Sequence, residues 1–134
     1  MIYITRKEHF SASHLLNNPE LDNMSNEEIF GKCNNFHGHN YYLEVTLCGD
    51  VDPKSGYLVD LKILKNIINN HIIEKVDHKF LNEVDIFKDV IPTTENIVKI
   101  FWEILRSKID FPNAKLFSVR VHETDKNYAE IKND

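Results

Sequence analysis

Two hydrophobic periods follow one another along this chain, and their order limits the possible fold more than any other feature. A two-residue period, which is typical of half-buried strands, occupies four segments, covering residues 2–14, 39–51, 56–61 and 114–123. A helical period occupies two stretches between the third and the fourth of these segments. The order strand, strand, strand, helix, helix, strand predicts an α+β domain. Both helices should cover one face of a four-stranded antiparallel sheet.

Local signals predict where the elements begin and end. The run Asp52-Pro53-Lys54-Ser55-Gly56 is typical of a hairpin connection, so we expect residues 56–61 to return as a strand. Asp60 can cap the first helix, and Pro92-Thr93-Thr94-Glu95 gives the second helix a threonine cap and an early acidic residue. Residues 17–28 are polar and predict a loop with one short helical turn. The apolar residues of the helices are Leu61, Leu64, Ile67, Ile68 and Ile72 in the first, and Ile97, Ile100, Phe101, Ile104 and Leu105 in the second.

Length and charge exclude several classes of protein. The 134 residues suit a single domain spanning 1–134, and the formal charge of −5 argues against a protein whose main role is to bind nucleic acid. No apolar run approaches the ~20 residues of a membrane span, and the N-terminus lacks the apolar core of a signal peptide. The two cysteines, Cys33 and Cys48, fit a reducing compartment. We therefore expect a cytoplasmic protein with no membrane partner and no nucleic-acid partner.

The segment from Cys33 to His39 carries the strongest chemical signal. Residues i and i+2 of an extended chain point to the same side, so His37 and His39 can bind one metal ion. His14 ends the first strand on its apolar face and is the natural third ligand. A catalytic zinc ion has three protein ligands and one open position. The pattern therefore predicts a Zn²⁺ site formed by the three histidines, provided that neither strand contains a bulge.

Cys33 has two possible roles beside this site. It could be a fourth ligand that closes a structural zinc site, or it could stay off the metal as an acid/base thiol with a lowered pKa. Cys48 lies in a strand and is interpreted as ordinary packing.

Two further acidic positions are candidates. Asp77 precedes His78, and an adjacent carboxylate can orient and charge an imidazole, although a polar helix end would look the same. Glu123 continues the alternation of Phe117–Val121, so an unbroken strand would aim its carboxylate into the apolar side of the sheet. A buried carboxylate needs a partner, which a ligand with paired N–H donors would provide. The alternative is a glutamate at a strand end that turns to solvent.

In their order along the chain, these segments resemble the 6-pyruvoyltetrahydropterin synthase and 6-carboxytetrahydropterin synthase family. The resemblance covers nearly the whole chain and rests on the stretches FSASH, FGKCNNFHGHNY, DPKSGYLVDL, VDHKFLN, PTTENIV and VHETDKN. It implies the tunnelling fold, in which subunits join their sheets into a barrel and assemble as a homohexamer of two trimers. It also implies 7,8-dihydroneopterin triphosphate as the small-molecule substrate and active sites that lie between subunits.

The resemblance implies three groups of site residues. The zinc ligands would be His14, His37 and His39. The proton-transfer group would be Cys33, as the residue that abstracts a proton, with Asp77 and His78 as its relay. The pterin-binding group would be Glu123, as the ring anchor, with Thr94 and Glu95 flanking the pocket.

The resemblance leaves two products open. Three residues separate Cys33 from His37, a spacing typical of the bacterial 6-carboxytetrahydropterin synthases of the queuosine pathway, which release acetaldehyde and triphosphate. The stretches FGKCNN, TTENIV and ETDKN are more similar to the pyruvoyl type, which serves tetrahydrobiopterin synthesis. We expect 6-pyruvoyltetrahydropterin as the product and keep the carboxy product as the alternative. The presence of Cys33 disfavours the subgroup that has glutamate at this position and serves folate synthesis.

Two readings from other classes compete with a zinc-dependent lyase. The first is a non-catalytic zinc-binding assembly module in which Cys33 completes the ligand set. The second is another pterin-binding enzyme of the same fold, an aldolase or epimerase. The histidine triplet argues against the second reading, because those relatives work without metal.

Overall fold

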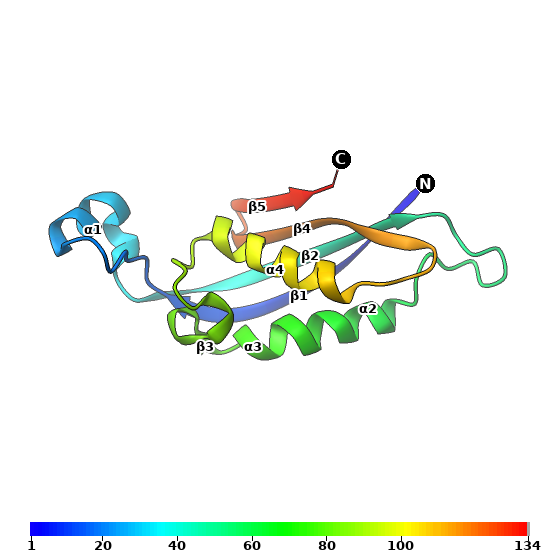
Figure 1. Cartoon of the computed structure of the whole chain (residues 1–134), viewed down its shortest axis with the longest axis horizontal. Helices are drawn as coiled ribbons and strands as arrows, with labels where there is room; N and C mark the ends of the chain where they lie inside the picture. The colour runs from blue at the N-terminus through cyan, green and yellow to red at the C-terminus, as the bar shows by residue number, and fades with distance from the viewer. Residues whose placement is uncertain (134) are drawn as a thin grey trace.

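The computed structural model describes residues 1–133 and consists of a five-stranded sheet with helices packed on one face (Figure 1). The strand order is β3-β1-β2-β4-β5. The bounds of the strands are β1 Ile2–His14, β2 His37–Gly49, β3 Lys79–Phe80, β4 Ala114–Thr124 and β5 Asn127–Lys132. The short β3 runs parallel to β1, and the other neighbouring strands are antiparallel. The α+β class and the placement of the helices on one face are confirmed.

Two helical stretches cover this face of the sheet. The first begins with α2 (Leu61–Ile68) and continues through a π-helical turn (Asn69–Ile73) into α3 (Glu74–Val76). The second is α4 (Thr94–Lys108). Helix α1 (Asn23–Phe30) lies apart from them, at the end of the molecule where the chain passes from β1 to β2 (Figure 1). Short 3-10 turns complete the chain at η1 Gly31–Asn34, η3 Leu81–Glu83 and η4 Asp85–Phe87.

The predicted caps of both main helices are present. The Asp60 carboxylate accepts a hydrogen bond from the backbone N–H of Lys62 at 2.9 Å. The Thr93 hydroxyl accepts one from the backbone N–H of Asn96 at 3.1 Å. These bonds satisfy amide groups that the first helical turn leaves without a partner.

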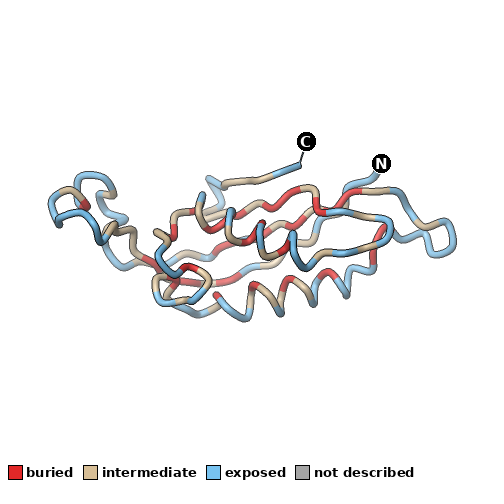
Figure 2. Tube along the Cα trace, viewed as in Figure 1, coloured by how far each residue is buried: buried red, intermediate tan, exposed pale blue. Residues whose placement is uncertain are grey.

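The hydrophobic core lies between the sheet and the two helical stretches. Figure 2 shows buried residues along the central strands and on the sheet-facing sides of the helices, whereas α1 is mostly exposed. The fully buried residues include Leu64, Ile68 and Ile72 from the first stretch, Ile97, Phe101 and Leu105 from the second, and Tyr41, Leu43 and Val45 from β2. This packing fixes α4 over β4 and β5, and α2 and α3 over β1. No helix in residues 1–133 has both the length and the apolar character that a bilayer crossing requires.

The expected strand at residues 56–61 is wrong. The segment forms no strand, and Leu58 and Val59 are both buried although they are adjacent. A strand with one exposed face would bury only one of two neighbours, so this packing is incompatible with the alternation that we expected. Two strands of the structure were not expected from the sequence. They are β5, which forms a hairpin with β4, and the edge strand β3. Helix α1 also extends further than the single turn expected in the loop after β1.

The expected alternation of β4 is wrong at Phe117. The register between β2 and β4 shifts by one residue, because Thr46 pairs with Ser118 and Leu47 pairs with Leu116. Leu116 is therefore the buried residue, and the ring of Phe117 lies 4.7 Å from the ring of Tyr3 in an edge-on contact. Val119 and Val121 are buried as expected.

Candidate functional site

The pairing of β1 with β2 brings three histidines together. His14 lies directly opposite His37, and His39 lies opposite Ala12, with no break in register between the strands. Each histidine offers a ring nitrogen, and these nitrogens lie within 4.8 Å of one another. The strands contain no bulge here, so the alternation that placed the three side chains on one face is preserved. We refer to His14, His37 and His39 as the histidine triad.

Backbone carbonyl groups fix the orientation of two triad rings. Nδ1 of His14 lies 2.9 Å from the carbonyl oxygen of Pro92, and Nδ1 of His37 lies 2.6 Å from that of Asn35. A carbonyl group can only accept, so both Nδ1 atoms carry the proton and donate. The two Nε2 atoms are then unprotonated acceptors in the neutral rings, yet they lie only 3.0 Å apart.

This arrangement fits a bound cation. Two facing lone pairs repel each other, and Nε2 of His39 is buried with no hydrogen-bond partner. Metal-bound histidines commonly donate their other N–H to a carbonyl or carboxylate, as His14 and His37 do. A single ion with three imidazole ligands would satisfy all three nitrogens and leave a position open.

Burial favours the neutral, metal-binding form of two triad histidines, His14 and His39. Burial, together with the charges of His37 and His39, lowers the pKa of His14, against the opposing effects of the hydrogen bond to Pro92 and the charge of Glu123. Burial also lowers the pKa of His39, against the opposing effect of Glu123. Metal binding requires neutral imidazole, so these shifts favour the metal-binding form at neutral pH.

Glu123 lies beside the triad. One of its carboxylate oxygens is 4.0 Å from Nε2 of His14, and the other is 4.0 Å from Nε2 of His39. The hydroxyl of Thr94 donates to Oε2 of Glu123 at 2.9 Å. The side chain is partly buried and points to the helix-covered side of the sheet, as the alternation of β4 predicted. The pairing of β4 with β5 shifts between His122 and Thr124, so Glu123 occupies a bulge rather than the expected regular strand.

The N-terminus of α4 joins these groups. Pro92 supplies the carbonyl that holds His14, Thr93 is the cap residue, and Thr94 holds Glu123. Glu95 is exposed on the first turn. Reasoning from sequence missed Pro92 and also Tyr41, whose hydroxyl lies 3.3 Å from Nδ1 of His14. The amino-acid sequence does not indicate which backbone carbonyl will accept a hydrogen bond from a distant side chain. The position of Tyr41 in its strand indicated only a core residue.

Cys33 lies on the connection from β1 to β2, apart from the triad's ligand atoms. It is exposed in η1, where its carbonyl accepts from the backbone N–H of Leu16 at 2.8 Å. The side-chain amide of Asn34 donates to the carbonyl of Leu16 at 2.9 Å, which ties this turn to the chain that leaves β1. Within residues 1–133, the cluster able to hold a metal contains the three histidines and not Cys33. Cys48 is buried, as expected.

Asp77 and His78 form a pair at the edge of the sheet. Nδ1 of His78 lies 3.0 Å from a carboxylate oxygen of Asp77, and that same oxygen accepts from the backbone N–H of Ser11 at 3.0 Å. Burial raises the pKa of Asp77, but the hydrogen bonds from Ser11 and His78 and the charges of His78 and His9 outweigh this effect, so the pKa lies below its usual value. His78 is largely exposed and has a positive φ of 61°. In the described part of the chain, no hydrogen bond or ion pair joins this pair to the triad.

Comparisons with known proteins show which family the chain belongs to. A family model described as 6-pyruvoyl tetrahydropterin synthase matches residues 3–134. The chain belongs to this family. It is 41% identical over 128 residues to the 6-pyruvoyl tetrahydrobiopterin synthase of Drosophila melanogaster. This match covers 93% of this chain and 76% of that protein. The human protein of the same name is 40% identical over 134 residues, covering 98% and 91%.

Solved structures and other relatives agree with this membership. The structure of Caenorhabditis elegans 6-pyruvoyl tetrahydropterin synthase has a TM-score of 0.91 at 39% identity and covers 99% of this chain and 96% of that one. A 6-carboxy-5,6,7,8-tetrahydropterin synthase from Bacillus subtilis is 29% identical over 126 residues, covering 90% and 77%. The family identified from sequence motifs is therefore confirmed.

Proposed function

We propose that this protein is a zinc-dependent lyase that converts 7,8-dihydroneopterin triphosphate into 6-pyruvoyltetrahydropterin with elimination of triphosphate. One observation carries the proposal most directly. Three imidazole nitrogens converge, one of them buried without a partner, and the carboxylate of Glu123 lies 4.0 Å from two of these rings. A metal site beside a ring-binding carboxylate suits a substrate that has both hydroxyl groups and a pterin.

His14, His37 and His39 would hold the zinc ion. When bound, zinc supplies Lewis acidity that polarises the hydroxyl groups of the substrate side chain. Tyr41 supports this site, because burial raises the pKa of its hydroxyl, which therefore stays protonated beside His14.

The remaining residues bind the substrate and move protons. Glu123 accepts hydrogen bonds from the N–H edge of the pterin, and the Thr94 hydroxyl orients its carboxylate. Glu95 lies on the same helical turn, at the rim of the pocket. The Cys33 thiolate removes a proton from the substrate side chain, and Asp77 with His78 relays protons during elimination of triphosphate.

We propose that the active site is completed between subunits of a homohexamer built from two trimers. Asp77 and His78 lie at the edge strand, and no hydrogen bond or ion pair within residues 1–133 connects them to the triad. A second subunit would bring such a pair to the substrate. The sheet has a second face that no helix covers, and β5 is an open edge, so the fold offers surfaces for joining sheets.

The alternative product is 6-carboxytetrahydropterin. The three-residue spacing between Cys33 and His37 favours it, whereas the relatives at 40% and 41% identity are named as pyruvoyl enzymes. A non-catalytic zinc module is the remoter alternative. It is disfavoured by the exposed position of Cys33 outside the metal-binding cluster.

The deciding experiment is incubation of the zinc-loaded protein with 7,8-dihydroneopterin triphosphate, followed by mass analysis of the products. A pyruvoyl side chain with free triphosphate supports the proposal. A carboxy side chain with acetaldehyde supports the alternative product. Stoichiometric zinc without turnover would contradict both enzyme proposals and favour the assembly module.

A further inference from the structure

The chain that leaves β1 is held by a side-chain amide from another part of the sheet. Leu15 follows the last residue of β1 and belongs to no strand itself. Oδ1 of Asn82 accepts a hydrogen bond from the Leu15 N–H at 3.0 Å, and the amide nitrogen of Asn82 donates to the Leu15 carbonyl at 2.9 Å. One side chain therefore satisfies both backbone groups of Leu15.

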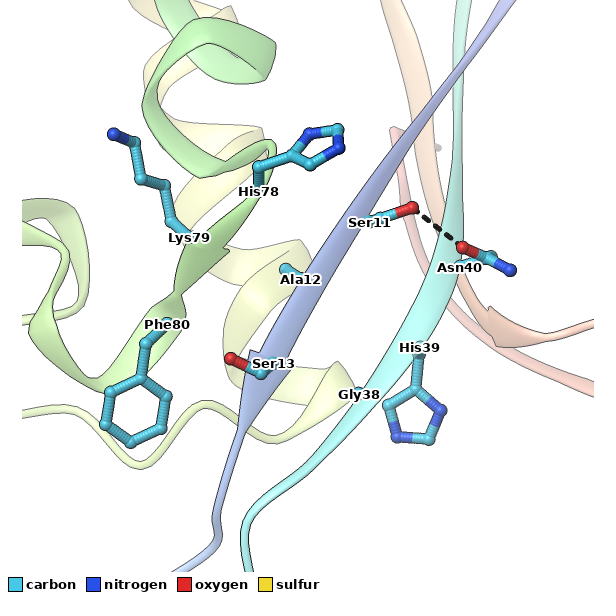
Figure 3. Close-up of a pocket in the computed structure, with 9 residues that line it drawn as sticks. All are labelled: Ser11, Ala12, Ser13, Gly38, His39, Asn40, His78, Lys79 and Phe80. Atoms are coloured by element: carbon cyan, nitrogen blue, oxygen red, sulfur yellow. Dashed lines mark hydrogen bonds between the residues drawn. The ribbon is translucent and has the colours of Figure 1, made fainter.

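The edge of the sheet fixes the position of Asn82. Residues 78–80 run alongside residues 11–13 of β1 (Figure 3), and Asn82 follows β3 in the turn η3. At the start of this segment, the Asp77 carboxylate accepts from the backbone N–H of Ser11 at 3.0 Å. The side chains of Asp77 and Asn82 thus close the two ends of a ladder to which β3 itself contributes only two residues.

Leu16 continues this connection to Cys33. Its N–H donates to the Cys33 carbonyl at 2.8 Å, and its carbonyl accepts from the Asn34 amide at 2.9 Å. The Leu15 carbonyl and the Leu16 N–H belong to one planar peptide unit. This unit accepts from Asn82 on one side and donates to Cys33 on the other. A rotation of the unit would disturb both bonds, so Asn82 fixes an orientation on which the Cys33 turn depends.

The turn η1 depends on these bonds because it has little packing of its own. None of its four residues is buried, and Cys33 is exposed. A segment with few buried contacts opens at a low free-energy cost. The two hydrogen bonds to Leu16 are therefore the contacts that tie this turn to the end of β1.

We propose that Asn82 is a positioning residue for Cys33 and acts through the peptide unit between Leu15 and Leu16. The catalytic importance of Cys33 rests on the proposed function, which makes its thiolate the base. A base must lie within hydrogen-bond reach of the proton that it removes, so a displaced turn lowers turnover.

A double-mutant cycle with 7,8-dihydroneopterin triphosphate tests this role. We expect Asn82→Ala to lower kcat about tenfold, the scale of one lost hydrogen bond, and to change KM less than about twofold. In the Cys33→Ala protein the same substitution should change kcat less than about twofold, because the group that Asn82 positions is missing. Asn133→Ala is the control. It removes an amide bond to the Leu116 carbonyl at 2.8 Å, at the other end of β4 from Glu123, and should leave kcat unchanged.

Hydrogen exchange tests the same connection without substrate. We expect the Leu16 amide to exchange about tenfold faster in Asn82→Ala and at the wild-type rate in Asn133→Ala, as resolved by fragmentation and mass spectrometry. Asn82→Leu keeps the approximate size of the side chain and removes its amide. It should match Asn82→Ala in both measurements, so either variant carries the test if the other fails to fold.

The outcomes separate this proposal from the proposed function. Equal losses of kcat with and without Cys33 would show that Asn82 acts by another route and would overturn the proposal. Unchanged exchange at Leu16, or an unchanged kcat in Asn82→Ala, would also overturn it. Faster exchange at Leu16 in a protein that does not turn over the substrate would support the connection and refute the proposed reaction.

Discussion

At the scale of single residues, the site depends on which atoms carry protons. The carbonyl groups of Pro92 and Asn35 hold the protons of His14 and His37 on Nδ1. Their Nε2 atoms are thus acceptors that face each other, and the buried Nε2 of His39 has no hydrogen-bond partner. A cation is the simplest partner for this set.

We expect His39→Ala to abolish stoichiometric zinc binding at neutral pH, because two imidazoles do not complete a three-ligand site. Metal content after dialysis, measured by atomic emission, checks this. His71→Ala, on the helical stretch after α2, is the control and should keep its zinc. A His39→Ala protein that retains one zinc per chain would exclude His39 as a ligand.

We expect Glu123→Gln to weaken pterin binding by roughly 10- to 100-fold, since an amide N–H then faces the N–H edge of the ring and leaves a contact worth about 1–3 kcal/mol unsatisfied. Zinc content should not change. Fluorescence titration with a pterin provides the affinity. The exposed Glu103→Gln on α4 is the control, and equal affinities in both variants would mean that Glu123 does not bind the ring.

We expect Cys33→Ala to bind zinc and pterin but to lose turnover by about 10²-fold or more, the usual scale of general acid–base catalysis. The reason is that Cys33 lies outside the metal-binding cluster. Cys48→Ala should alter only packing, because Cys48 is buried. Loss of zinc from Cys33→Ala alone would make this cysteine a ligand and remove the proposed base.

At the scale of secondary-structure elements, the first turn of α4 organises the site. Its Pro92 carbonyl holds a triad ring, and its Thr94 hydroxyl holds the carboxylate of Glu123. Thr93 fixes where this turn begins by accepting from the Asn96 N–H. The position of both functional groups therefore depends on the cap.

We expect Thr93→Ala to lower the free energy of unfolding by about 1 kcal/mol, the typical value of a threonine cap. Urea denaturation followed by circular dichroism measures the change. Ser107→Ala, near the C-terminal end of the same helix, removes an exposed hydroxyl that bonds only to Ile104 and should cost less than about 0.5 kcal/mol. Equal stability of the two variants would show that α4 does not depend on its cap.

At the scale of the whole molecule, one chain does not join all the proposed catalytic groups. The triad and Glu123 lie on the helix-covered face, whereas Asp77 and His78 lie at the β3 edge. Assembly of several chains is the arrangement that would bring these groups together.

Mixing two inactive variants tests this arrangement. We expect Cys33→Ala and His78→Ala to regain activity when they are dissociated and reassembled together. In a random mixture, about a quarter of the sites formed between neighbouring chains would contain both native residues. Activity assays before and after reassembly, with size determination by light scattering, provide the measurement. No recovery in a mixed hexamer would place Cys33 and His78 of one site on the same chain.

The sequence alone determined the elements whose signals are local. The alternation of side chains predicted strands β1 and β2 and the convergence of His14, His37 and His39. Capping chemistry predicted the starts of both main helices. Both signals act between near neighbours in the chain. Alternation also predicted the inward direction of the Glu123 side chain, although Glu123 lies in a bulge and not in a regular strand.

The tertiary structure decided what depends on contacts between distant segments. Residues 56–61 bury two adjacent side chains, which no local period predicts, and the register shift beside Phe117 arises only where β4 meets β2. Strand β5 forms by pairing with the free edge of β4. The Pro92 carbonyl accepts a hydrogen bond from His14, which lies 78 positions away in the chain. Every residue except proline carries the same backbone N–H and C=O groups, so only the folded chain shows which of these groups meet.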